Sequence, residues 1–211
     1  MDELAALRAE YAHRGLDEAD LPTDPMDAFR AWFAEARDAG FHEPNAMVVS
    51  TVSAEGVPSS RLVLLKVFDE RGFGFFTNLA SLKAVDLAAR PECALLFPWH
   101  PVQRQVRVVG RASLLPRDEV AAYFAGRPRG AKLGAWASRQ SQVVASRAEL
   151  EAAYAEAQQR FPEEVPVPEE WGGYLVEPRE LELWQGRPDR MHDRVRYRRR
   201  DGRWVRERLA P

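Results

Sequence analysis

The sequence is poor in cysteine and lysine, and it has no long apolar run. Its single cysteine, Cys93, lies in the apolar stretch 93–97, which excludes an intrachain disulfide framework and fits a core position in the reducing cytosol. No apolar run approaches the roughly 20 residues that span a bilayer, and the first residues lack the basic and apolar segments of a signal peptide. We therefore expect a soluble, cytoplasmic protein without a membrane partner.

Several catalytic signatures are also missing. The sequence has no glycine-rich Rossmann or P-loop pattern and no G-x-S-x-G nucleophile elbow. Its four histidines lack metal-ligand spacing, and Cys93 in an apolar strand is a poor nucleophile. These absences argue against dinucleotide, metal and triad-hydrolase chemistry, and no metal site is expected.

Positive and negative charges are nearly balanced, but almost all of the basic residues are arginine. Thirty basic residues face thirty-two acidic ones, for a net charge of -2, so the whole molecule is not a cationic nucleic-acid binder and any anion site must be local. Lysine occurs only at positions 66, 83 and 132. A compact ammonium and a planar guanidinium bind phosphate differently, so these lysines are candidates to follow.

The length of 211 residues and the hydrophobic fraction of 45% predict one globular domain over 1–211. Leu4, Leu7 and Tyr11 recur at helical spacing, which predicts an N-terminal helical arm within 1–20. Asp24 and Pro25 then form a helix-start signal before an amphipathic helix that extends to Gly40.

Runs of β-branched and aromatic residues predict five successive strands at 46–53, 58–69, 72–78, 92–100 and 104–115. Hairpin-length connections favour antiparallel pairing and a closed or partly closed barrel over a parallel sheet. Further helices are predicted at 81–90, after Pro116, through Trp136 after a break at 127–130, and from Ser146 to about 160. Final strands are expected at 173–176, 180–185, 195–200 and 203–209, the last two joined by an Asp201-Gly202 turn.

The C-terminal segment 187–208 is strongly basic, with ten arginines against four acidic residues. One interpretation is a solvated edge hairpin whose charges discourage aggregation, and another is nucleic-acid binding, which sparse aromatic residues disfavour. If the strand were extended from residue 190, Arg190, His192 and Arg194 would point to one side. Such a cluster is expected to bind a phosphorylated or aromatic ligand, unless the segment is a solvated loop.

Three other groups of residues have phosphate-binding chemistry. Arg61 and Lys66 bracket an apolar strand, and their spacing places them on opposite faces unless a bulge re-aims one of them. Thr77, Ser81 and Lys83 lie at a helix start, which is either a phosphate cradle or a simple N-cap. Weaker candidates are Gln105, Gln140 and Ser141 for a heterocycle rim and Tyr123 with Arg127 for a phosphate.

Nine motifs occur in order along the chain: R-L-V-L-L-K at 61–66, F-F-T-N at 75–78, L-L-F-P-W-H at 95–100, R-Q-V at 104–106, G-A-W-A-S-R-Q-S at 134–141, W-G-G at 171–173, W-Q-G at 184–186, R-M-H-D-R at 190–194 and the terminal R-L-A-P. With these motifs the chain strongly resembles the pyridoxine/pyridoxamine 5′-phosphate oxidase family. The resemblance runs from the N-terminal arm to Pro211.

The resemblance implies an antiparallel, FMN-binding split β-barrel with flanking helices, working as a homodimer in which the C-terminal hairpin 190–211 completes the site. The positions that match the family's FMN contacts are Arg61, Leu62, Val63, Leu64, Leu65, Lys66, Phe76, Thr77, Lys83, Gln105, Gln140, Ser141, Trp184 and Arg194. Those that match substrate contacts are Arg8, Tyr11, Lys66, Tyr123, Arg127, Arg190 and His192, with Arg190 and His192 as the catalytic pair.

The resemblance also implies a reaction. Pyridoxamine or pyridoxine 5′-phosphate is oxidised to pyridoxal 5′-phosphate by hydride transfer to FMN, and oxygen then reoxidises the flavin with release of peroxide. His192 and Glu43 are candidates for a base. Three positions depart from the family's usual residues: Leu82 stands in place of an arginine, Ala131 of a hydroxyl residue and Glu43 of an aspartate. These changes bear on affinity more than on reaction type.

Three alternatives remain at this point. A sibling flavin enzyme on the same barrel, such as a phenazine-biosynthesis oxidase, is the nearest, and Leu82 and Ala131 point toward it. The second is a non-catalytic module that binds flavin or pyridoxal phosphate. The third is a nucleic-acid binder that uses the arginine hairpin.

Overall fold

The computed structural model describes residue 11 and residues 15–211. In it the chain forms two compact units. The described part of the first unit comprises residue 11 and residues 15–49, 94–110 and 178–211, and the second unit comprises 50–93 and 111–177. Each unit has buried apolar residues of its own. The single domain expected over residues 1–211 remains a prediction.

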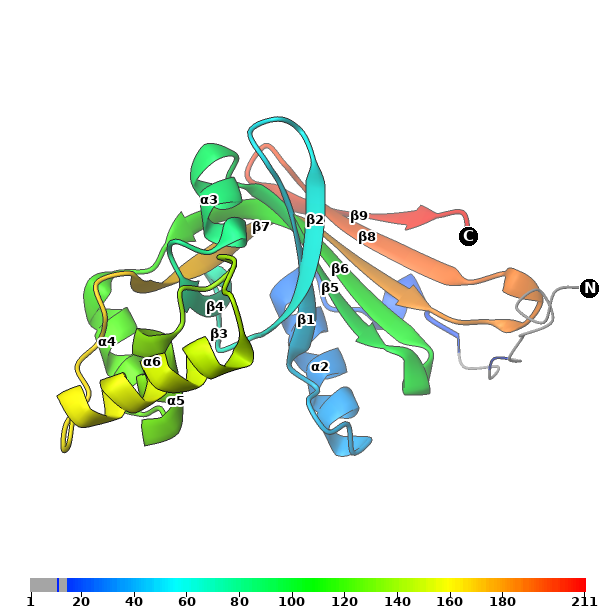
Figure 1. Ribbon diagram of the computed structural model, residues 1–211. Helices are drawn as coiled ribbons and strands as arrows, with labels where there is room; N and C mark the ends of the chain where they lie inside the picture. The colour runs from blue at the N-terminus through cyan, green and yellow to red at the C-terminus, as the bar shows by residue number, and fades with distance from the viewer. Residues whose placement is uncertain (1–10, 12–14) are drawn as a thin grey trace, which may run out of the picture. The chain divides into compact units, whose positions relative to one another are not determined.

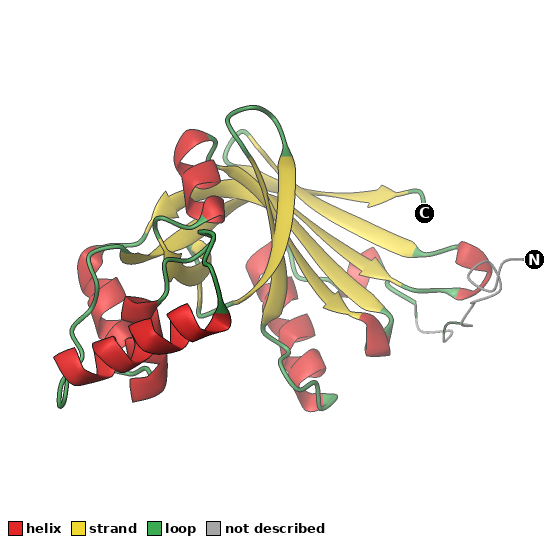
Figure 2. Cartoon of the chain, in the orientation of Figure 1, coloured by secondary structure: helices red, strands yellow, loops and turns green. Residues whose placement is uncertain are grey.

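Nine strands form the sheet of the described chain, and Figures 1 and 2 show them with the flanking helices. They are β1 (Ala46–Val52), β2 (Pro58–Leu64), β3 (Val67–Asp69), β4 (Gly72–Asn78), β5 (Glu92–Trp99), β6 (Arg104–Leu114), β7 (Trp171–Gln185), β8 (Asp193–Arg200) and β9 (Arg203–Leu209). The pairing order is β2-β1-β5-β6-β7-β4-β3, with β8 on β7 and β9 on β8. The β3–β4, β4–β7, β7–β8 and β8–β9 pairs are antiparallel, as predicted.

The helices are α2 (Pro25–Asp38), α3 (Leu82–Ala89), α4 (Arg117–Ala125), α5 (Arg129–Ala137) and α6 (Arg147–Arg160), with short 3₁₀ turns at Glu18–Asp20, His100–Val102 and Pro188–Arg190. All five α-helices are at positions predicted from the sequence. The predicted break at 127–130 is too long, since α5 already begins at Arg129. No helix among the described residues is long and apolar enough to span a membrane.

In the first unit, α2 packs an aromatic face onto strand residues. The Asp24 carboxylate accepts a hydrogen bond from the Met26 N–H at 2.7 Å, which caps the helix as predicted. Phe29 is fully buried, and its ring centroid lies 4.8 Å from that of Phe97 and 5.8 Å from that of Trp99. The contacts between these aromatic rings form the core that holds α2 in place.

The C-terminal hairpin of the first unit turns at Asp201 and Gly202, as predicted. Both residues have positive φ, 49° and 77°, which is the geometry of a two-residue hairpin turn. On β8, Val195 and Tyr197 are fully buried and pair with Leu183 and Leu181 of β7. One face of the hairpin therefore belongs to the core of this unit.

Arginines on this hairpin hold the segment that leads into α2. The Arg208 guanidinium donates to the carbonyl of Leu16 at 3.0 Å and to the carboxylates of Glu18 and Asp193, both at 2.8 Å. The Tyr197 hydroxyl donates to the Pro22 carbonyl at 2.7 Å. The positive charge of 187–208 is thus partly used for ion pairs and backbone contacts inside the first unit.

The prediction of two separate strands at 173–176 and 180–185 is wrong, because β7 runs unbroken through Pro178. In the second unit β4 pairs with residues 171–176, and in the first unit β8 pairs with residues 180–185. Pro178 falls between these two ladders, where its missing N–H breaks neither of them.

The second unit has two apolar clusters beneath its helices. Leu115, Val120, Phe124 and Trp171 form one with α4, and Leu133, Ala157 and Val165 form the other, which involves α5 and α6. Figure 2 shows these three helices gathered together. The Ser146 hydroxyl accepts the Glu149 N–H at 3.3 Å and caps α6, as predicted.

A glycine on β4 allows close approach of β3, and this leads to a stability prediction. A Cβ added at Gly74 would lie 2.7 Å from the Val67 Cβ, so Gly74→Ala is expected to lower the free energy of unfolding by about 1–3 kcal/mol. The matched control is Gly134→Ala in α5, where an added Cβ meets nothing within 4 Å and helix propensity predicts a gain of roughly 0.5–1 kcal/mol. Urea denaturation of both variants measures the two signs, and equal effects would contradict the close approach.

Candidate functional site

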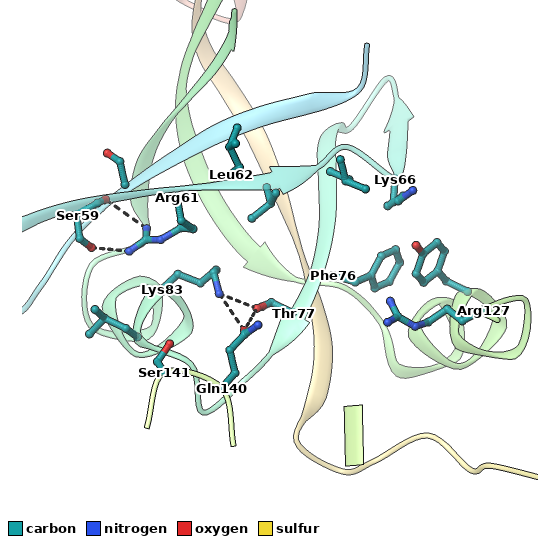
Figure 3. A pocket seen from close by; sticks show the side chains of 15 residues that line it. Ser59, Arg61, Leu62, Lys66, Phe76, Thr77, Lys83, Arg127, Gln140 and Ser141 are labelled. Atoms are coloured by element: carbon teal, nitrogen blue, oxygen red, sulfur yellow. Dashed lines mark hydrogen bonds between the residues drawn. The ribbon is translucent and has the colours of Figure 1, made fainter. Parts of the chain in front are cut away.

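Fifteen residues of the second unit line a pocket of about 650 Å³ (Figure 3). Twelve of them are residues predicted from the sequence: Arg61, Leu62, Val63, Leu64, Lys66, Phe76, Thr77, Lys83, Tyr123, Arg127, Gln140 and Ser141. They come from β2, β4, α3, α4 and the loops next to them. The structure therefore brings together residues that lie up to eighty positions apart in the sequence.

A break in the predicted strand 58–69 aims Arg61 and Lys66 into the same pocket. The strand stops at Leu64 and resumes at Val67, so the regular alternation that would separate the two side chains is interrupted. The Lys66 N–H donates to the Gly74 carbonyl at 2.8 Å, which fixes the backbone at the break. This local break in the strand re-aims one of the two side chains, and the other possibility, that Arg61 and Lys66 bind different ligands, remains a prediction.

Polar groups gather at one end of the pocket around Lys83. Its ammonium donates to the hydroxyls of Thr77 and Ser81, at 3.1 Å and 3.2 Å, and to the amide oxygen of Gln140, at 3.0 Å. The Ser81 side chain makes no capping hydrogen bond to α3, although it stands at the N-cap position. The simple N-cap interpretation of this segment is therefore wrong, since the hydroxyl faces the cation cluster. We call this group, together with Arg61, the anion end of the pocket.

The charge at the anion end is buried. Lys83 is 7% exposed, and burial, followed by the nearby positive charge of Arg61, lowers the pKa of its ammonium to about 8. Burial likewise lowers the pKa of Arg61, while Asp86 acts in the opposite direction. Two close cations with a depressed lysine pKa make a site that gains from binding an anion.

The other end of the pocket has a stack of aromatic rings beside two more cations. The rings of Phe76 and Tyr123 are parallel within 3°, with centroids 3.9 Å apart, and the Trp171 ring lies 5.3 Å from Phe76. The Arg127 guanidinium lies 4.9 Å from the centroid of Trp171. Figure 3 shows Lys66 and Arg127 on either side of Phe76, away from Arg61 and Lys83. We call this part of the pocket, with Lys66, Tyr123 and Arg127 beside the aromatic stack, the aromatic end.

Arg127 has a donor that the described residues leave unused. One of its terminal nitrogens donates to the Ala131 carbonyl at 3.2 Å, whereas its Nε is buried and has no hydrogen-bond partner in the described chain. A buried donor without a partner costs free energy, roughly 1–3 kcal/mol, and such groups mark sites where a ligand is bound. The Arg127 side chain is thus available to a ligand at the aromatic end.

Three pocket residues were missed from the sequence as site residues, namely Ser59, Ser60 and Leu82. The two serines directly precede Arg61 in the sequence. Hydroxyls next to a predicted phosphate contact are the feature from which these two site residues could have been predicted. Leu82 was noted only as a departure, and its side chain is now seen at the pocket with the residue 52% exposed. Leu65, which was predicted as a contact, is instead 7% exposed and does not line the pocket.

The remaining predicted residues belong to the first unit, except for Arg8, which lies outside the described residues. Tyr11 meets the rings of Trp184 and His192 at centroid distances of 6.0 Å and 5.6 Å. Arg194 donates to the Glu182 carboxylate at 2.8 Å and to the Ala210 carbonyl at 3.0 Å. Gln105 lies on β6, among the half-buried residues.

The condition of an extended strand from Arg190 to Arg194 is not met. Residues Pro188–Arg190 form a 3₁₀ turn, Asp189 and Arg190 have positive φ, and β8 begins only at Asp193. Alternation of side chains therefore does not apply before β8.

A backbone hydrogen bond indicates which tautomer the neutral ring of His192 adopts. Its Nδ1 accepts the Arg187 N–H at 3.1 Å, which places the proton of the neutral ring on Nε2. In this state His192 is a hydrogen-bond donor through Nε2, and it has no free lone pair with which to act as a base. Its predicted candidacy as a base is therefore weakened, while a role in orienting a ligand fits its geometry.

Comparison with known proteins gives matches along most of the chain. Residues 33–161 match the family model described as pyridoxamine 5′-phosphate oxidase, and residues 171–211 match the one described as the pyridoxine 5′-phosphate oxidase C-terminal dimerisation region. A protein named pyridoxine/pyridoxamine 5′-phosphate oxidase from a Nocardioides species is 64% identical over 209 residues, covering 99% of this chain and 98% of its own length. A protein of the same name from Streptomyces avermitilis is 56% identical over 214 residues, covering 98% and 96%.

Two solved structures show the fold. PhzG from Burkholderia lata, in complex with tetrahydrophenazine-1-carboxylic acid, superposes with a TM-score of 0.89 at 30% identity, covering 94% of this chain and 99% of its own. An FMN-binding protein related to pyridoxamine 5′-phosphate oxidase, from Nostoc punctiforme, has a TM-score of 0.72 at 17% identity, covering 90% and 100%. The predicted fold class, an antiparallel split β-barrel with flanking helices, is confirmed.

The lowered pKa of Lys83 predicts a pH-dependent stability difference. In the unfolded chain this ammonium titrates near 10.5, and in the folded protein near 8, so the folded state binds fewer protons between these values. The destabilising charge is present below about pH 8 and is lost as the pH rises through the folded pKa. Relative to Lys83→Met, the unliganded wild type is therefore expected to become more stable between pH 7 and pH 9.5.

Urea denaturation of both proteins at the two pH values measures this difference. Lys132→Met is the matched control, because Lys132 lies outside this pocket and its ammonium donates to the Ala125 carbonyl at an exposed position. A stability difference between wild type and Lys83→Met that stays constant with pH would show that Lys83 titrates as an ordinary lysine.

Proposed function

Because this chain belongs to the pyridoxamine 5′-phosphate oxidase family, we propose that it oxidises pyridoxamine or pyridoxine 5′-phosphate to pyridoxal 5′-phosphate with FMN as cofactor. The observation that carries the proposal is the division of one pocket into two cationic ends, one of which lies beside a stack of aromatic rings. Two phosphate groups, one of a flavin and one of a substrate, fit such a division. The relatives that carry this name are similar over nearly the whole chain.

The anion end fits the phosphate of FMN. Lys83 and Arg61 supply positive charge, and Thr77 and Ser81 supply hydroxyls within hydrogen-bonding distance of the lysine. Burial and the nearby charge of Arg61 lower the pKa of Lys83 to about 8, and a bound phosphate would stabilise its ammonium form. The residues present therefore fit the cofactor.

The aromatic end fits the phosphate of the substrate. Lys66 and Arg127 are cations, and Tyr123, which lines the same pocket and stacks on Phe76, adds a hydroxyl donor. The unpartnered Arg127 Nε gives this end a buried donor that a phosphate oxygen would satisfy. The Ala131 carbonyl already holds one terminal nitrogen of Arg127, so the guanidinium is oriented before ligand binds.

FMN, when bound, supplies the hydride acceptor and passes the electrons on to oxygen, which is released as peroxide. This chain's own residues hold the reacting groups in place. We assign Arg190 and His192 to the orientation of the substrate ring, His192 through its Nε2–H, and Gln105, Trp184 and Arg194 to the flavin. Placement and charge, rather than a protein-derived nucleophile, are then the protein's contribution to the reaction.

The working form is proposed to be a homodimer. Residues 171–211 match a dimerisation region, and they include β8, β9 and the segment from Arg190 to Arg194. A second copy of the chain is therefore the proposed partner. Tyr11 and Arg8 are assigned to an arm over the substrate.

The likeness to PhzG supports the fold and leaves the substrate to be decided by the pocket. PhzG is complexed with a carboxylic acid that carries a ring system, whereas this pocket has cations at two ends. Two phosphates use both ends, and a phosphorylated substrate is therefore favoured over an unphosphorylated one.

The proposal predicts a visible reaction of the purified protein. It is expected to bind FMN and to be yellow, and pyridoxamine 5′-phosphate added without oxygen is expected to bleach the flavin absorbance near its visible maximum. Pyridoxamine without the phosphate is the matched control and should bleach it at least about a hundredfold more slowly, because it cannot use Arg127 and Lys66. Retention of FMN without bleaching by either vitamer phosphate would indicate a non-catalytic flavin-binding module.

A substitution at Arg190 tests its assigned role. Arg190→Gln is expected to lower kcat/KM at least about a hundredfold while FMN stays bound, because the charge acts on the reacting substrate and not on the cofactor. Arg203→Gln, on the exposed start of β9, is the control and should leave kcat/KM unchanged within about twofold. Steady-state kinetics with an FMN absorbance check gives both values, and unchanged turnover in Arg190→Gln removes this residue from the reaction.

A further inference from the structure

A buried carboxylate stands behind the anion end of the pocket. Asp86 belongs to α3, is 2% exposed and does not line the pocket. Its Oδ2 accepts hydrogen bonds from the hydroxyls of Thr51, at 2.6 Å, and Ser59, at 3.2 Å. A buried charge without a partner is costly, so the cation that balances it is part of the same structure.

That cation is Arg61, and two hydroxyls join it to the carboxylate. One terminal nitrogen of Arg61 donates to Thr51 Oγ1 at 2.7 Å, and the other donates to Ser59 Oγ at 2.5 Å. The guanidinium nitrogen nearest to Asp86 Oδ2 is 4.0 Å away, beyond direct hydrogen-bonding distance. The hydroxyls therefore mediate the interaction between the two charges.

The carboxylate sets the direction in which the two hydroxyls donate, while Arg61 also donates to the Ser59 carbonyl at 3.3 Å. An ionised carboxylate only accepts, so Thr51 and Ser59 each give their single O–H to Asp86. Their oxygens are then left as acceptors and are turned to the two terminal nitrogens of Arg61. The position of the guanidinium is thereby fixed by two hydroxyls that the carboxylate orients.

This arrangement matters more in this chain because Leu82 stands at the pocket where the resembled family commonly has an arginine. Leu82 offers no charge to an anion. Arg61 and Lys83 are then the cations of the anion end. Without a third cation at position 82, the affinity for an anion depends more strongly on the orientation of Arg61.

We propose that Asp86 is a positioning residue that holds Arg61, through Thr51 and Ser59, in the orientation that binds the FMN phosphate. This inference rests on the proposed function, since it takes the ligand of the anion end to be FMN. Asp86 itself does not touch the ligand, and it acts only through the two hydroxyls.

Two simpler roles for Asp86 predict different results. If only its charge mattered, removing a negative group near an anion site would strengthen anion binding. If it only joined α3 to β1 and β2, its loss would weaken binding of every ligand to the same extent. Positioning predicts a loss that is specific for the phosphate group of the ligand.

Riboflavin has the ring and side chain of FMN without the phosphate, so comparing the two ligands isolates the phosphate. We expect Asp86→Asn, prepared as the apoprotein, to bind FMN at least about tenfold more weakly than wild type in flavin fluorescence titrations. Riboflavin binding should change less than about twofold. Tighter FMN binding, or an equal loss for both ligands, overturns the proposal, and so does unchanged FMN binding.

Substitutions at Thr51 provide an independent test if Asp86→Asn folds poorly. Thr51→Val keeps the side-chain shape and removes the hydroxyl, whereas Thr51→Ser keeps the hydroxyl. We expect Thr51→Val to weaken FMN binding severalfold with riboflavin unchanged, and Thr51→Ser to retain wild-type affinity. Equal FMN affinity in the two variants overturns the hydroxyl connection.

The same titrations separate this inference from the proposed function. If wild type binds FMN no more tightly than riboflavin, the anion end does not hold the flavin phosphate, and both proposals fail. If wild type prefers FMN and Asp86→Asn keeps that preference, only the role of Asp86 fails.

Discussion

Burial of positive charge is the constraint on which the pocket depends. Lys83 is almost fully buried, and Arg61 is close enough to lower the pKa of its ammonium. The fold tolerates these cations because hydroxyls, an amide oxygen and the carboxylate of Asp86 surround them. Strand β4, helix α3 and the loop before α6 each supply part of this surrounding, so their positions follow from the need to solvate two charges without water.

At the aromatic end, the packing of the rings determines the geometry. Phe76, Tyr123 and Trp171 lie in near-parallel planes, and Gly173 allows this because a Cβ there would come within 2.8 Å of the Phe76 ring. The stack gives a flat wall beside the guanidinium of Arg127. Cations at both ends and a flat aromatic wall at one of them are the features on which the proposed binding of planar, phosphorylated ligands rests.

Local patterns in the sequence predicted most elements of the fold, because capping residues, turn residues and alternation act over a few positions. Asp24, Ser146 and the Asp201-Gly202 turn are confirmed examples. The failures came where tertiary context overrides local pattern, as in the continuation of β7 through Pro178 and the turn at Arg190. Asp86 was not foreseen at all, since an acidic residue on a short helix gives no sign of the two hydroxyls it meets across thirty-five and twenty-seven positions.

The hydrogen bond from Arg208 to the Leu16 carbonyl joins residues 192 positions apart. During synthesis on the ribosome, the segment around Leu16 emerges long before β9, and the contacts of Arg208 with Leu16, Glu18 and Asp193 form only after the last strand is released. Until then Leu16 and Leu21, both 9% exposed in the folded protein, lack the cover that β9 helps to hold over them. The nascent chain therefore carries an unfinished apolar edge until β9 has emerged and Arg208 can make these contacts.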